Sequence, residues 1–173
     1  YILTAYNPIN NEAKASNVTV LSTINGSDIT KYYKNGTQYS AVVVYSNGTP
    51  IVNKTVKLNI NGVFYNRVTD ENGTVRLNIN LDPATYIITV YNPSNGEENS
   101  NKIVVLSKLI AEDMKTDYQA GKSYKVKVVN GQGKALANQT VKININGVIY
   151  NRVTDENGTA YLAIRLNPGT YIC

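Results

Sequence analysis

The chain has 173 residues, no histidine, one cysteine and a formal net charge of +5. Without histidine it lacks the side chain that most often acts as a general base or a metal ligand near neutral pH, so we expect no enzyme, no cofactor and no metal site. The positive charge is spread along the sequence and no apolar run reaches about 18 residues, which argues against nucleic-acid binding and against a membrane-spanning segment. The one cysteine, Cys173, excludes a disulfide framework within the chain.

The sequence predicts strands and no helix of note. Seven short segments are rich in Val, Ile, Thr and Tyr and are separated by Asn, Gly, Pro and Asp, which is typical of strands joined by turns. In chain order they are Ile24–Thr30, Tyr39–Tyr45, Thr55–Ile60, Val63–Val68, Thr74–Leu81, Tyr86–Tyr91 and Lys102–Leu106. Short strands at this spacing indicate an all-β fold made of β-sandwich modules.

The sequence repeats with a period of 85 residues. The 14-residue segment beginning at Asn61, NGVFYNRVTDENGT, returns from Asn146 with only Phe64 replaced, by Ile149. A period of this kind indicates tandem copies of one structural module. In this frame residues 1–21 are the closing hairpin of a preceding repeat, residues 22–106 are a complete domain, and residues 107–173 are a domain that lacks its last hairpin.

The two copies together predict which strand face is buried. Val42 corresponds to Lys127, so this position faces solvent, whereas its neighbours are apolar in both copies and face the core. The inward set that follows from this alternation is Ala41, Val43, Val56, Leu58, Ile60, Val75, Leu77, Ile79 and Leu81. Between two of these strands, Asn61-Gly62 predicts a type I′ hairpin turn. Lysines in strands are expected on the outward face.

A tyrosine follows a proline turn in both copies, in LDPATY ending at Tyr86 and LNPGTY ending at Tyr171. In Ig-like sandwiches a tyrosine at this place forms a tyrosine corner, with its hydroxyl bonded to backbone a few residues upstream. We therefore interpret Tyr86 and Tyr171 as structural.

The VTDENGT and PGTY motifs resemble the Ig-like tandem repeats of adhesin-like surface proteins of methanogenic archaea, and more loosely the invasin and intimin type of bacterial Ig-like repeat. The resemblance covers both periods. It implies tandem Ig-like β-sandwich modules of about 85 residues in an extracellular, cell-surface protein that serves as a stalk, an adhesin shaft or a filament.

Asparagines in glycosylation sequons support an exterior location, because they fall at predicted turns and strand edges. They are Asn17, Asn25, Asn35, Asn47, Asn53, Asn72, Asn138 and Asn157. The alternative is that Asn-Gly turns followed by Thr create sequons incidentally.

Other sites find less support in the sequence. A calcium site at Asp70 and Glu71, or at Asp155 and Glu156, lacks enough further carboxylates, because Asp82 becomes Asn167 in the second copy. The same acid pairs lack the cleft of a glycosidase. A Lys-to-Asn or Lys-to-Asp crosslink needs a buried lysine, which the outward parity disfavours.

A carbohydrate-binding module is the alternative function. It requires a planar row of exposed aromatics, for which Tyr65 with Tyr150, or Tyr32 with Tyr33, are the candidates.

The frame of the repeat suggests strand complementation. The domain at residues 107–173 is expected to expose an apolar groove that includes Val126, Val128, Ile143 and Ile164. The complementary strands are those of residues 1–21, and the candidate side chains are Tyr1, Leu3, Val18 and Val20. Head-to-tail insertion between copies would then build a filament. The alternative is that neighbouring repeats of a longer array supply the missing strands covalently. Partners are thus copies or repeats of the protein itself, with surface glycans or proteins as further candidates.

Overall fold

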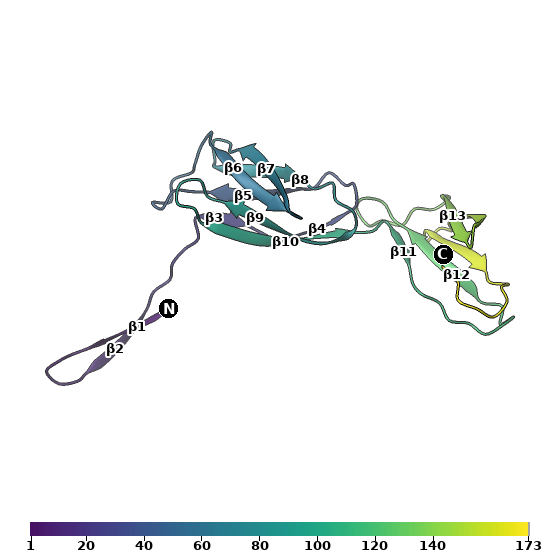
Figure 1. Cartoon of the computed structure of the whole chain (residues 1–173), viewed down its shortest axis with the longest axis horizontal. Helices are drawn as coiled ribbons and strands as arrows, with labels where there is room; N and C mark the ends of the chain where they lie inside the picture. The colour runs from purple at the N-terminus through teal and green to yellow at the C-terminus, as the bar shows by residue number, and fades with distance from the viewer. Residues whose placement is uncertain (173) are drawn as a thin grey trace. The chain divides into compact units, whose positions relative to one another are not determined.

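The computed structural model describes residues 1–172, and Cys173 lies outside the described residues. Within this range the chain forms strands, turns and loops and no helix (Figure 1), so none of the described residues forms a helix suited to crossing a membrane. The strands are β1 (Ile2–Tyr6), β2 (Ala13–Asn17), β3 (Ile24–Gly26), β4 (Ile29–Tyr32), β5 (Gln38–Val43), β6 (Thr55–Ile60), β7 (Val63–Val68), β8 (Thr74–Asn78), β9 (Ala84–Tyr91), β10 (Glu98–Leu106), β11 (Leu109–Ala111), β12 (Ser123–Val128), β13 (Thr140–Ile145), β14 (Val148–Val153) and β15 (Thr159–Ala163). The predicted all-β, Ig-like sandwich fold is confirmed.

Backbone contacts divide the chain into two compact units. The first comprises Tyr1–Ser27, Ser40–Arg76 and Thr89–Ser100, and the second comprises Asp28–Tyr39, Leu77–Ile88 and the chain from Asn101 onward. This division passes through β5, β8, β9 and β10 and differs from the limits at residues 22 and 107 that the repeat suggests. Those domain limits stay a prediction.

Strands β3 to β10 form two sheets. One has the order β3-β5-β8 and the other β4-β10-β9-β6-β7. The single predicted strand Ile24–Thr30 is wrong, because β3 pairs antiparallel with β5 whereas β4 pairs parallel with β10. The chain leaves the first sheet at Ser27 and enters the second after Asp28, whose Oδ1 accepts a hydrogen bond from the Lys102 backbone amide at 2.7 Å.

The inward side chains of these sheets are buried as the alternation predicts. Ala41, Val43, Val56, Leu58, Ile60, Val75, Leu77 and Ile79 are all buried. Leu81, three residues beyond the end of β8 at Asn78, is the exception and is half-buried.

Lys31 contradicts the expectation that strand lysines face solvent, because its side chain is buried. Its Nζ donates to the backbone carbonyls of Asn35 (3.0 Å), Thr37 (2.8 Å) and Ile79 (2.7 Å). Burial lowers the pKa of this ammonium group. The three carbonyls replace the water that the ammonium loses, so the buried charge is tolerated without a carboxylate.

The hairpin turns have the predicted backbone. Asn61 (φ 53°) and Gly62 (φ 77°) both lie in the left-handed region between β6 and β7, as a type I′ turn requires. Gly73 also has positive φ (70°), but a Cβ there would lie 2.6 Å from the Val43 carbonyl oxygen. This close approach of two backbone segments needs glycine.

Gly73→Ala and Gly62→Ala therefore form a matched pair. Both place Ala at positive φ, which costs about 1–2 kcal/mol, but only Gly73→Ala adds a backbone clash. We expect Gly73→Ala to lower the free energy of unfolding by about 1–3 kcal/mol more than Gly62→Ala, measured by urea denaturation. Equal losses would contradict the assigned contact.

Candidate functional site

We call residues 22–106 the middle module and residues 107–172 the second copy. The N-terminal hairpin, β1 and β2, repeats the closing hairpin of the middle module, β9 and β10. β1 and β2 pair antiparallel, with Thr4 opposite Ala15. The residues 85 positions later, Thr89 and Ser100, lie across β9 and β10, where their hydroxyl groups are 2.8 Å apart. The two hairpins therefore share one register.

The loops of the two hairpins also have the same hydrogen bonds. The Asn7 amide donates to the Glu12 carbonyl at 2.8 Å, and the Asn92 amide donates to the Glu97 carbonyl at the same distance. The Asn7 and Asn92 side-chain oxygens each accept the amide of the residue two positions on, at 2.9 Å. The β1–β2 hairpin thus already has the conformation that its counterpart has in the sandwich.

The two hairpins differ in burial. Ile88, Val90, Ile103 and Val105 are buried in the middle module. At the matching positions Leu3 is 61% exposed and Val20 is 75% exposed. Ala5 and Val18 are exposed as well, and Tyr1 matches Tyr86. The candidate residues Tyr1, Leu3, Val18 and Val20 are therefore accessible, and three of them occupy core positions of the repeat.

Among the described residues, the second copy shows no strand at the place of β9. In the middle module β6 lies between β7 and β9, whereas the matching β13 lies in a two-stranded sheet with β14, and residues 169–172, which match the start of β9, form no strand. Residues 114–117, which match β4, form no strand. Likewise β2 ends at Asn17, one residue before the position where the matching β10 begins to pair with β4. Residues 18–21 and residues 114–117, which match the paired parts of β10 and β4, thus form no strand in this chain.

The expected apolar groove is only partly open. Val126 and Ile143 are buried, which corrects the prediction that they line an exposed groove, whereas Val128 and Ile164 are half-buried. The reason is that β12, β13 and β15 pack a small core of their own, with Tyr124 and Leu166 at its margin. Among the described residues, one edge of β13 is not paired with a strand. A further strand could therefore pair with its backbone, whereas the core side chains are already buried.

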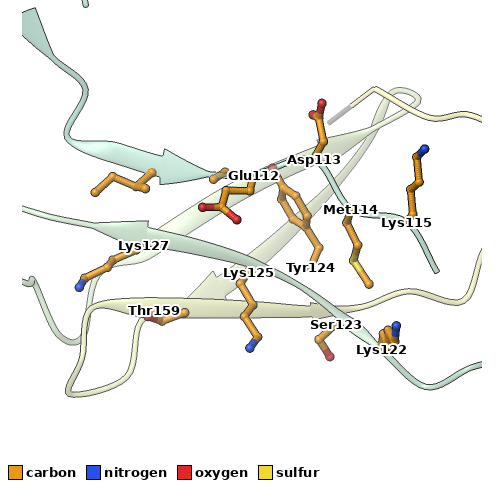
Figure 2. A pocket seen from close by; sticks show the side chains of 12 residues that line it. Glu112, Asp113, Met114, Lys115, Lys122, Ser123, Tyr124, Lys125, Lys127 and Thr159 are labelled. Carbon is orange, nitrogen blue, oxygen red and sulfur yellow. The ribbon is translucent and has the colours of Figure 1, made fainter.

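A hollow of about 640 Å³ lies beside β12, lined by residues 110–115, residues 122–125, Lys127 and Thr159. In Figure 2, Lys125 and Ser123 point to one side of β12 and Tyr124 points to the other. The lining includes Met114 and Lys115, which belong to the irregular segment that matches β4. Charged side chains of both signs line the hollow, with Glu112 and Asp113 among lysines.

In the middle module a polar corner attaches the closing hairpin to the start of β3. The Glu97 carboxylate accepts hydrogen bonds from Ser22 Oγ (2.5 Å), from the Thr23 amide (2.9 Å) and from Thr23 Oγ1. These bonds, that of Ser22 first, lower the pKa of Glu97. Asn92 is buried and its Nδ2 donates to Thr23 Oγ1 at 2.7 Å and to the Val44 carbonyl at 2.9 Å.

Sequence reasoning missed this corner, although the signal was available. Asn7 and Glu12 recur as Asn92 and Glu97, with the same spacing of five residues inside a loop. A carboxylate and an amide kept at fixed positions of a repeat indicate a shared hydrogen-bonding role.

The two repeated tyrosines make similar bonds. Tyr86 Oη donates to the Asp82 carbonyl at 2.9 Å, and Tyr171 Oη donates to the Asn167 carbonyl at 3.0 Å. This is the bond expected of a tyrosine corner. Its contribution to stability stays a prediction.

Most sequon asparagines are exposed. Asn17, Asn25, Asn47, Asn53, Asn72, Asn138 and Asn157 face solvent, whereas Asn35 is half-buried and its Nδ2 donates to the Gly131 carbonyl at 3.1 Å. Seven of the eight sites are thus accessible to modification, and whether they are glycosylated stays a prediction.

The acidic turn has a structural use. Asp70 Oδ1 accepts the amides of Asn72 (3.0 Å) and Thr74 (2.9 Å), and its Oδ2 pairs with Arg76 Nη1 at 2.6 Å. Asp155 makes the same backbone bonds to Asn157 and Thr159. Within residues 1–172 no three Asp, Glu, His or Cys residues gather as a metal site would require.

Cations lie over several aromatic rings, including two of the candidates for a carbohydrate site, Tyr65 and Tyr150. Lys57 Nζ lies 4.3 Å from the Tyr91 ring centre and 5.0 Å from that of Phe64. The guanidinium groups of Arg67 and Arg152 lie over Tyr65 and Tyr150, at 5.6 and 5.7 Å. Phe64 and Tyr91 are also tilted by 47° to each other and form no planar row.

Residues 24–107 match the family model of macroglobulin domain MG4. Among curated proteins, none matches this chain. Similar solved structures include a Ca²⁺-stabilised adhesin that helps an Antarctic bacterium bind ice (16% identity, 94% of this chain and 47% of that chain, TM-score 0.35). Invasin, a bacterial integrin-binding protein, gives 17% identity over 86% of this chain and 34% of that chain, with a TM-score of 0.41.

A third similar structure is the SGBP-B protein of Bacteroides ovatus in complex with a mixed-linkage heptasaccharide (16% identity, 85% of this chain and 38% of that chain, TM-score 0.35). The chain spans less than half the length of each of these three proteins. Similarities at such low identity and TM-score carry no functional argument. The archaeal origin suggested by the sequence motifs stays a prediction.

The repeat offers a matched pair to test the polar corner. Asn92→Ala leaves buried partners unsatisfied, so we expect the free energy of unfolding to fall by about 2 kcal/mol or more. Asn7→Ala occupies the same position of an exposed hairpin and is expected to change it by less than about 0.5 kcal/mol. Urea denaturation at low protein concentration measures both values. A similar loss in the two variants would contradict the difference in burial.

Asp70 predicts a specific acid sensitivity. The bond from Arg76, followed by the Thr74 amide, lowers the pKa of Asp70 to about 2. A carboxylate with a lowered pKa stabilises the fold above its unfolded pKa, and this contribution is lost as the pH falls from about 4 through about 2. Thermal denaturation across that range should show a smaller loss for Asp70→Asn than for the wild type. A wild-type slope unchanged by Asp70→Asn would contradict the assignment.

Proposed function

We propose that this chain is a non-enzymatic, extracellular structural or adhesive repeat protein, serving as a stalk, an adhesin shaft or a filament. We further propose that its modules join head to tail by strand complementation. The observation that carries this proposal is the match between two parts of one chain: β1–β2 has the register and loop of β9–β10, and among the described residues β14 is the one strand that pairs with β13.

The middle module serves as the template for the joined state. There β9 pairs with β6, and β10 pairs parallel with β4 through Ile103–Leu106. By the repeat, β1 of one copy would pair with the edge of β13 in another and replace there that copy's own residues 171–173, which match residues 1–3 in the sequence. Val18–Leu21 would pair with residues 114–117. A free strand edge with unpaired amides and carbonyls favours such addition.

A covalent array reaches the same pairing by another route. In that case a neighbouring repeat in a longer protein supplies the hairpin to residues 107–173. Both routes build an extended series of β-sandwiches from one repeated sequence. Such a series suits a spacer or shaft at a cell surface. The exposed sequons support the same location and the description as a glycoprotein.

The carbohydrate-binding alternative finds less support. Sugar stacking uses free aromatic faces, but Lys57 lies over Phe64 and Tyr91, and Arg67 lies over Tyr65. A ligand would have to displace these cation–π contacts. Surface glycans and surface proteins remain further proposed partners of this chain.

Strand complementation is tested by a pair of adjacent residues on β1. Leu3 matches the buried Ile88, whereas Ile2 matches Ile87, which is exposed in the middle module. We expect Leu3→Asp to abolish concentration-dependent assembly in light scattering, and Ile2→Asp to leave it within about threefold of wild type, because only the first charge would be buried. A wild-type chain that stays monomeric at high concentration, in the presence of reductant, contradicts complementation.

A further inference from the structure

We propose that Lys108 selects which module accepts the hairpin, by pairing with the Glu12 carboxylate of a second copy of this chain. This inference rests on the proposed strand complementation and adds a specificity-determining residue to it. The starting point is the polar corner of the middle module, where the carboxylate of Glu97 accepts two hydrogen bonds from Thr23.

The donor half of the corner is already formed in the free hairpin. The Glu12 amide donates to Asn10 Oδ1 at 3.0 Å, and the Glu97 amide donates to Asn95 Oδ1 at the same distance. Glu12 is exposed. Its backbone thus has the geometry that places the Glu97 carboxylate at the corner.

The acceptor half is formed as well. Ser107 Oγ donates to the Leu109 carbonyl at 2.7 Å and accepts the Leu109 amide at 3.0 Å, which repeats the bonds between Ser22 and Ile24. The Lys108 carbonyl accepts the Val129 amide at 2.9 Å, as the Thr23 carbonyl accepts the Val44 amide. The backbone around Lys108 therefore has the same local hydrogen bonds as the backbone around Thr23.

One substitution distinguishes the two corners. Thr23, which bonds to the Glu97 carboxylate in the middle module, corresponds to Lys108 in the second copy. Lys108 is half-buried, so an ammonium group replaces a hydroxyl where a carboxylate is expected. A charge-assisted bond is stronger than the neutral one it replaces. The hairpin bearing Glu12 should thus prefer a module with lysine at this place over one with threonine.

The test uses full-length chains and a charge swap, with reductant present because of Cys173. Glu12→Lys alone and Lys108→Glu alone each set like charges against each other at every junction between identical copies. We expect each single variant to need about tenfold higher concentration than wild type to assemble, as measured by light scattering. In an equimolar mixture, a filament in which the two variants alternate has opposite charges at every junction, so the mixture should assemble within about threefold of wild type.

Two matched variants control for net charge. Glu71→Lys and Lys54→Glu make the same charge changes at exposed positions outside the corner, and they should assemble like wild type both alone and mixed. Circular dichroism and the unfolding midpoint of each variant verify that the fold is intact.

The outcomes separate this inference from the proposed function. If wild type assembles and the single charge variants assemble equally well, Lys108 is no determinant and strand complementation stands. Failure of the mixed variants to recover assembly would also remove Lys108 as a determinant and leave strand complementation standing. If wild type itself does not assemble, strand complementation between copies is wrong and the selection by Lys108 falls with it.

Discussion

The parallel pairing of β4 with β10 is the constraint on which the rest of the structure depends. It joins the beginning of the middle module to its end through Ile103–Leu106, and it places β9 and β10 between β4 and β6. At the matching places of the repeat, residues 114–117 form no strand, β2 ends at Asn17, and among the described residues β14 is the one strand that pairs with β13. We propose that the absence of this strand pair is the common cause.

The preformed hairpin favours completion of the sheet. Burying Leu3, Val18 and Val20 would each contribute about 1.5–3 kcal/mol, less what side-chain ordering costs. Since the Asn7–Glu12 loop already has the hydrogen bonds found in the sandwich, little backbone freedom remains to be lost on docking. Within residues 1–172, the second copy has fewer buried core residues than the middle module. This small core holds β12, β13 and β15 together and is compatible with the pairing of a further strand along β13.

Much of the fold follows from sequence because the period of 85 residues and the alternation of apolar positions specify strands, turns and inward faces. Asn61-Gly62 predicts its turn because few residues accept positive φ. The switch between β3 and β4 at Ser27–Asp28 was not predictable, because a strand that changes sheets keeps the same alternation on both sides. Lys31 was missed for a different reason: its burial depends on three carbonyls from the loop at residues 35–37 and from Ile79, which sequence spacing does not bring together.

Amide hydrogen exchange, compared between the dilute chain and the assembled chain, tests the central claim most directly. If copies join through the missing parallel pair, the amides of residues 19–21 and of residues 114–117 should exchange fast when dilute and become protected together on assembly. Assembly that protects neither segment, or only one of them, would contradict the account.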